Sequence, residues 1–184
     1  MKSNMLLLLL TLGVVVAVLR LLELTALNTG PSPGPDGADV VHEAHQFDFW
    51  LGDWDLTWGK DGKGTNSVHS ILGGRIVQEN FVATAGATAG FTGMSVSAYN
   101  KEQGKWFQTW VDNQGAYLDF VGEFKDNKMT LSRKAIKDGK EFLQRMVWQD
   151  ISKNSITWQW ERSDDEGKSW TTVWTVHYQR KASG

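Results

Sequence analysis

The sequence predicts an all-β fold in which ten antiparallel strands run up and down and close into one barrel. Apolar and polar residues alternate with period two along short segments, and turn-forming clusters such as residues 60–64 separate these segments. None of the three prolines falls inside a segment, so each hydrogen-bond ladder can be continuous. Closure is expected because an open meander would leave two exposed edges that invite aggregation, although an open sandwich is the alternative.

The turn signals place the strands in order along the chain. Between them we expect strands at residues 53–60, 65–72, 75–84, 91–100, 105–113, 116–124, 128–136, 140–149, 155–163 and 169–180. Asp-Gly and related pairs in the turns supply the positive φ angles that tight hairpins need. Helices are disfavoured because segments such as 156–163 repeat with period two and are rich in Trp and Thr.

Period two also assigns the faces of the strands. On the first strand, Trp54, Leu56 and Trp58 are expected to point inward. The inward residues expected on the last three strands are Phe142, Gln144, Met146, Trp148, Ile156, Trp158, Trp160, Trp170, Trp174, Val176, Tyr178 and Arg180. The residues expected to face water include Asp53, Asp55, Thr57, Thr175, His177 and Gln179.

Residues 1–27 are expected to be a signal peptide or an N-terminal membrane anchor. An uncharged apolar run from Met5 to Leu19 ends at Arg20. Because residues 5–22 approach the length of a membrane-spanning helix, cleavage and retention as a hydrophobic helix both stay open. The rest of the chain is expected to be exported, as a periplasmic or secreted domain when cleaved and held at the inner membrane when uncleaved.

Residues 28–45 are expected to form a linker and residues 46–184 the barrel. All three prolines lie in the first of these segments, a composition typical of semi-rigid linkers. The chain has 19 basic and 21 acidic residues, so no surplus of positive charge favours nucleic-acid binding. A chain without cysteine forms no disulfide or thiolate metal site, and no metal or other cofactor is expected.

The barrel is expected to begin with the aromatic segment FDFWLGDWDLTW, residues 47–58. Phe47, Phe49 and Trp50 are predicted to form a plug turn under the barrel, because large aromatic side chains dominate protein cores. The carboxylate of Asp48 can cap this turn.

Gly52-Asp53-Trp54 resembles the Gly-x-Trp signature of the lipocalin and calycin barrels. In that superfamily the tryptophan closes the narrow end of the barrel and stacks on an Arg or Lys of the last strand. Arg180 stands where that partner is expected. The resemblance therefore implies a barrel closed by Gly52, Trp54 and Arg180.

More narrowly, four segments together resemble an uncharacterised family of exported bacterial lipocalin-like domains. They are FDFWLGDWDL, GGRIVQENF, GKWFQTWVDNQG and SDDEGKSWTTVW with the later YQR. The resemblance covers residues 45–180. It implies a ten-stranded calycin or lipocalin-like barrel and no settled activity.

Polar residues inside the barrel are the candidate ligand contacts, because burying a polar group without a partner costs about 1 to 3 kcal/mol. The expected ligand-binding residues are Glu79, Trp106, Gln108, Trp110, Asp112, Arg145, Trp158 and Trp160. The parity of Glu79 and of Arg145 conflicts with that of neighbouring apolar residues, so a β-bulge is expected near one of them. A structural hydrogen-bond network that pairs Arg145 with Asp112 or Glu79 is the alternative.

The leading functional hypothesis is a binding module whose lumen holds a hydrophobic, apolar or aromatic small molecule. A lumen filled completely by the ten tryptophans is the competing possibility. A second hypothesis is an enzyme that acts on a lipid-like substrate with Asp112 or Glu79 as base. Because nothing in the sequence selects this reaction, an enzyme is the less favoured hypothesis.

A third hypothesis is a haem protein similar to the nitrobindins, which are ten-stranded calycin-like barrels that hold haem through a histidine. The outward position expected for His177 disfavours it. His42 and His45 lack a third metal ligand nearby. The small residues at 83–90 are expected to form a mobile loop at the mouth, with a lid role as a hypothesis.

Overall fold

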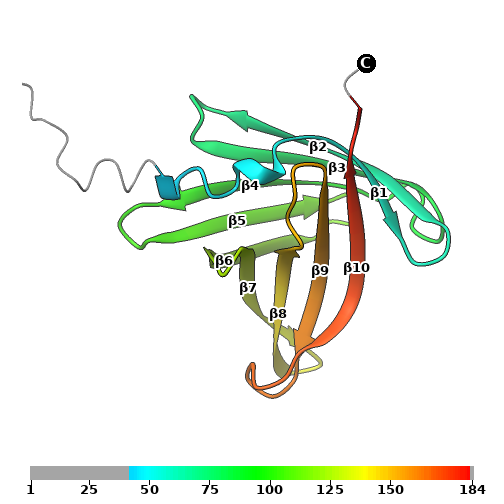
Figure 1. Ribbon diagram of the computed structural model, residues 1–184. Helices are drawn as coiled ribbons and strands as arrows, with labels where there is room; N and C mark the ends of the chain where they lie inside the picture. Colours follow the sequence, from blue (N-terminus) through cyan, green and yellow to red (C-terminus); the bar gives the residue numbers. More distant parts are fainter. Residues whose placement is uncertain (1–41, 183–184) are drawn as a thin grey trace, which may run out of the picture. The chain divides into compact units, whose positions relative to one another are not determined.

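A computed structural model describes residues 42–182 of the chain. Ten strands form one closed antiparallel sheet, in which each strand pairs with its neighbours in sequence and β1 pairs with β10 (Figure 1). This confirms the predicted up-and-down barrel. The predicted N-terminal hydrophobic helix, like the rest of residues 1–27 and most of the predicted linker, lies outside the described residues. Within residues 42–182, no helix is long and apolar enough to cross a membrane.

The elements begin and end close to the positions that the turn signals predict. In chain order they are η1 (Asp48–Trp50), β1 (Gly52–Trp58), β2 (Gly62–Ile71), β3 (Ile76–Ala85), β4 (Thr92–Asn100), β5 (Lys105–Asp112), β6 (Tyr117–Lys125), β7 (Lys128–Lys137), β8 (Lys140–Gln149), β9 (Ser155–Ser163) and β10 (Thr171–Arg180). Asp138 and Gly139 both have positive φ, as a two-residue hairpin turn requires.

The second strand begins three residues earlier than its glycines suggest. Gly62 and Gly64 belong to β2. The indole of Trp58 occupies the space where a Cβ of Gly62 would project, and a Cβ at Gly64 would meet both this indole and the backbone carbonyl oxygen of Val82. The glycines therefore accommodate a large inward side chain of β1, and only the preceding residues form the turn.

The inward faces follow period two over most of the sheet. Trp54, Leu56 and Trp58 are buried on β1, whereas the residues between them are exposed. The expectation for Trp170 is wrong because the β9–β10 register shifts between Thr172 and Trp174. This bulge reverses the parity of the chain before Val173, and the ring of Trp170 lies against the outward-facing Arg145, 4.0 Å from its guanidinium carbon.

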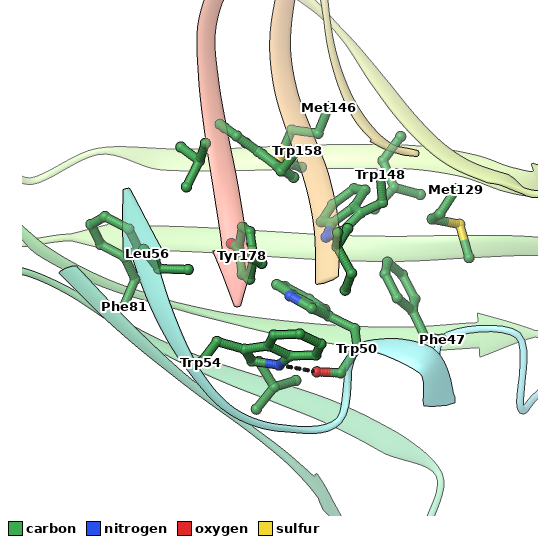
Figure 2. Close-up of a cluster of buried hydrophobic side chains, with 14 of the residues drawn as sticks. Phe47, Trp50, Trp54, Leu56, Phe81, Met129, Met146, Trp148, Trp158 and Tyr178 are labelled. Carbon is green, nitrogen blue, oxygen red and sulfur yellow. Dashed lines mark hydrogen bonds between the residues drawn. The ribbon is translucent and has the colours of Figure 1, made fainter. Parts of the chain in front are cut away.

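One end of the barrel is closed by the plug, which we define as residues 47–50. Phe47 is fully buried, and its ring lies 4.9 Å from that of Trp106 and 5.2 Å from that of Trp148. Figure 2 shows Phe47 and Trp50 of the plug below Trp148, and the dashed line marks the hydrogen bond of 2.8 Å that Trp54 Nε1 donates to the carbonyl of Trp50. The segment thus supplies both apolar surface and an acceptor for the indole of β1.

Arg180 joins the last strand to the first. Its guanidinium carbon lies 4.0 Å from the centre of the Trp54 ring, a cation–π contact. Its Nη1 donates to the carbonyl of Leu51, and its Nε to that of Lys153, both at 2.7 Å. Gly52 has a φ of 121°, and a Cβ there would overlap the guanidinium, so glycine leaves room for this contact.

A second position also requires glycine. The Cβ of an alanine at Gly122 on β6 would overlap the backbone carbonyl oxygen of Thr130 on β7. We expect Gly122→Ala to lower the free energy of unfolding by about 1 to 3 kcal/mol, because backbone cannot move aside as a side-chain tip can. Urea denaturation measures the loss. Val121→Ala, at the exposed neighbouring position, is the control and should stay within about 0.5 kcal/mol of the wild type; equal effects would contradict the steric explanation.

Candidate functional site: an aromatic cavity with a buried carboxyl group

A cavity of about 270 Å³ lies inside the barrel. Nine of its 15 lining residues are aromatic, namely five Trp, three Phe and one Tyr. Five lining residues are labelled in Figure 2, namely Phe81, Met146, Trp148, Trp158 and Tyr178. Trp148 also contacts Phe47, so the cavity and the plug share a wall. The ten tryptophans of the chain therefore do not fill the lumen.

Five of the eight expected ligand contacts line this cavity. They are Glu79, Trp110, Asp112, Trp158 and Trp160. Trp106 and Gln108 are buried but are not among the lining residues. Trp106 packs on Phe47 and donates to Gln46, and Gln108 donates to Ser97 at 2.9 Å.

The structure does not bring Arg145 to the cavity. Its neighbours in sequence, Gln144 and Met146, point to the opposite face of β8, and Met146 lines the cavity. Arg145 lies on the outer face, where its Nε donates to the carboxylate of Glu161 and its guanidinium covers the ring of Trp170. The expected pairing with Asp112 or Glu79 is therefore wrong, because a regular β8 strand keeps Arg145 opposite the inward residues.

Glu79 is the buried carboxyl group of the cavity wall. It lies on β3 between the buried Val77 and Phe81, so the strand is regular there and no bulge is needed. Asn66 Nδ2 donates to Glu79 Oε1 at 2.6 Å, and Ser95 Oγ donates to Oε2 at 2.7 Å. Burial raises the pKa of Glu79 to about 7, even though both hydrogen bonds lower it. The group therefore changes charge near neutral pH.

Tyr178 of β10 completes this polar cluster. Asn66 Nδ2 also donates to the Tyr178 hydroxyl at 3.1 Å, which links β2, β3 and β10 around one amide. Burial, together with the nearby Glu79, raises the pKa of Tyr178, so that the phenol stays neutral. We define these four residues, Asn66, Glu79, Ser95 and Tyr178, as the polar cluster.

Asp112 differs from Glu79 although both carboxyl groups line the cavity. Burial by itself raises the pKa of Asp112. Three hydrogen bonds outweigh this effect and lower the pKa: one of 3.0 Å from Trp110 Nε1 and two from the backbone N–H groups of Gln114 and Ala116. Asp112 is thus a charged group that also caps the β5–β6 turn. Of the two carboxyl groups expected as possible bases, Glu79 is the buried one.

Sequence reasoning missed three members of the polar cluster as site residues. Tyr178 is expected to point inward, but the alternation alone gives no reason to pair it with Glu79. Asn66 has the parity of the buried Val68, and this was the available signal for an inward polar side chain. Ser95 is fully buried between exposed neighbours, Met94 and Val96, so the polar residue faces inward and the apolar ones outward.

Loops surround the mouth of the barrel. A wider cleft of about 730 Å³ lies between residues 59–62 and 87–91 and shares Phe91 and Trp174 with the cavity. Residues 83–85 of the expected loop belong to β3, where Ala83 is buried, and the lid role of residues 86–90 stays a prediction. His177 is exposed on β10 opposite Thr57, outside the lumen. In the described part of the chain, no three His, Asp or Glu side chains gather in a way that could hold a metal ion.

One residue of the cavity lining has a buried polar atom without a hydrogen-bond partner within the described residues. This atom is Nε1 of Trp148, whose side chain is buried. An unpaired buried donor is costly, at about 1 to 3 kcal/mol.

Residues 47–180 match the model of a family described as "Protein of unknown function (DUF1579)". No curated protein matches the chain.

Proposed function

Because the match spans residues 47–180 of 184, the chain belongs to the DUF1579 family of proteins of unknown function, and on this premise we propose that its barrel binds an apolar or aromatic small molecule in the lumen. The aromatic cavity carries this proposal. Ligand sites in proteins are concave, mostly apolar and supplied with a few convergent polar groups. Glu79 and Asp112 are such groups among the residues that line this cavity.

The size of the cavity limits the ligand. A dry apolar cavity of about 150 Å³ holds benzene in another protein. A cavity of about 270 Å³ therefore suits a substituted single ring or a fused bicyclic molecule. A long-chain lipid would have to extend through the mouth.

We also propose that this barrel is related to the lipocalin and calycin barrels. Three features support it: ten up-and-down strands, a Gly-x-Trp sequence on β1, and Arg180 stacked on Trp54. In barrels of about this size the interior has room for one small ligand. Since the barrel architecture by itself carries many functions, the lumen and its side chains support the binding role.

A substitution that fills the cavity tests the proposal. Leu118 on β6 is half-buried and lines the cavity, so Leu118→Trp places an indole in the space that a ligand would occupy. We expect naphthalene and indole to bind to the wild type and the variant to bind them at least tenfold more weakly. Isothermal titration calorimetry measures both affinities.

Val121→Trp is the matched control for this substitution. Val121 lies on the same strand but on the outer face, with 41% of its surface exposed. Its substitution should leave the affinities within twofold of the wild type. A wild type that binds neither compound, or a control that loses binding as Leu118→Trp does, would contradict binding in the lumen.

We also propose that the barrel is exported. The apolar run within residues 5–22, which lies outside the described residues, supports an export signal or an anchor. Expressed in a Gram-negative bacterium, the full chain should appear in the periplasmic or membrane fraction, and deletion of residues 1–27 should keep the barrel in the cytoplasm. A full chain found only in the cytoplasm would contradict this.

A further inference from the structure

The charge of the cavity lining restricts the ligand further. Among the described residues that line the cavity, the two with carboxyl groups are Glu79 and Asp112, and none is Lys, Arg or His. A ligand that carries a negative charge would therefore meet like charges, and one that carries a positive charge would meet opposite charges. Attraction and repulsion of this kind are strong inside a barrel, because little water screens them.

The hydrogen bonds of Glu79 are arranged for a negatively charged group. Both of its oxygens accept, one from Asn66 and one from Ser95, which are neutral donors. The neighbouring titratable group from β10, Tyr178, is also neutral. No cation within the described residues is hydrogen-bonded to Glu79, so its negative charge lacks a counter-ion. A cationic ligand would supply that counter-ion at the cavity wall.

The aromatic lining favours the same charge. Cations bind over aromatic rings, and rings of Trp, Tyr and Phe that surround a cavity are the recognition mode for quaternary ammonium groups. The barrel holds its own guanidinium groups in this way at four positions, those of Arg133, Arg145, Arg162 and Arg180. The nine aromatic residues of the cavity offer similar surfaces without a cation among the lining residues.

Two arginines share the inward parity of β7 and β9 without lining the cavity. Arg133 Nη1 donates to Gln144 at 2.9 Å, and its guanidinium lies 5.7 Å from the ring of Phe120. Arg162 is paired with Asp164, and its guanidinium lies 3.8 Å from the ring of Phe142. Gln144 and Phe120 hold the guanidinium group of Arg133, and Asp164 and Phe142 hold that of Arg162. Neither group therefore serves as the counter-ion of Glu79.

We propose that the lumen selects cationic ligands, namely a small ammonium group carried on an apolar or aromatic body, with Glu79 as the counter-ion. This inference rests on the proposed binding function. Aromatic rings hold the apolar body, and Glu79 of the polar cluster faces the charge. Asp112 adds a second negative charge that draws cations toward the lumen.

The test compares two compounds of the same shape and different charge. Phenyltrimethylammonium is a permanent cation, and tert-butylbenzene is its neutral isostere. At pH 8 we expect the wild type to bind the cation at least tenfold more tightly, as measured by calorimetry. Glu79→Gln should weaken binding of the cation at least tenfold and change binding of the neutral compound less than twofold. Arg145→Gln, on the outer face, is the control and should change neither.

The pH dependence gives a second measurement that needs no variant. Because the cation does not titrate, its affinity should rise at least tenfold between pH 5.5 and pH 8 as Glu79 loses its proton, whereas the affinity of tert-butylbenzene should stay constant. Equal or tighter binding of the neutral compound, or a pH-independent affinity for the cation, would overturn this inference and leave the proposed function intact. If neither compound binds and naphthalene and indole do not bind, the proposed function fails as well.

Discussion

Trp54→Ala is expected to lower the free energy of unfolding by about 3 to 5 kcal/mol, the range for truncating a large buried aromatic side chain. Trp54 is fully buried at the closed end of the barrel. The substitution leaves a cavity, removes the hydrogen bond to the carbonyl of Trp50 and takes the ring away from Arg180. A single change thereby weakens both the plug and the seam between β1 and β10.

Urea denaturation followed by circular dichroism measures this loss, and Trp170→Ala is the matched control. Trp170 also stacks on a guanidinium, that of Arg145, but it lies on the outer face and is half-buried. Its loss should cost about 1 kcal/mol. If the two variants lose similar stability, burial at the closed end does not dominate the contribution of Trp54.

The fold was predictable because local signals agree along the chain. Period-two alternation, turn residues and the absence of proline from the strands each act over a few residues, so the sequence displays them directly. The closing pair of strands was predictable from Trp54 and Arg180 at opposite ends of the barrel sequence. The bulge before Trp174 was not, because the residues around it, Thr172 and Val173, suit a regular strand equally well.

Part of the site was predictable from the same alternation of inward and outward residues. Alternation places Trp110, Asp112, Trp158 and Trp160 inside, but it does not tell which inward residues meet across the barrel. Glu79 meets Tyr178 through Asn66, and these residues come from three strands whose relative heights depend on the register of the whole closed sheet. The expectation that Arg145 contacts a ligand is wrong because the alternation of β8 turns its side chain outward.

The structure also predicts that Glu79 makes the barrel less stable as pH rises. In the folded protein burial raises the pKa of Glu79 to about 7, whereas in the unfolded chain the pKa is near the ordinary glutamate value of 4.5. Between these two values the folded state keeps a proton that the unfolded state has lost. The free energy of unfolding therefore falls with increasing pH across this interval, by about 1.4 kcal/mol per pH unit and about 3 kcal/mol in total.

Glu79→Gln should remove this fall, because the amide stays neutral at every pH in the interval and can still accept from Asn66 while donating to Ser95. Above pH 7 the variant should therefore be more stable than the wild type, and at pH 4.5 the two should be similar. Urea denaturation at pH steps from 4.5 to 8 measures the difference.

Asp112→Asn is the control, since the pKa of Asp112 is lowered and its stabilising effect is lost only at acidic pH. The stability of this variant should therefore fall with pH as that of the wild type does. A wild type whose stability is constant over these steps would mean that Glu79 is ionised in the folded barrel at little cost. The negative charge would then be present without a ligand, and a cation would gain nothing from the rise in pH.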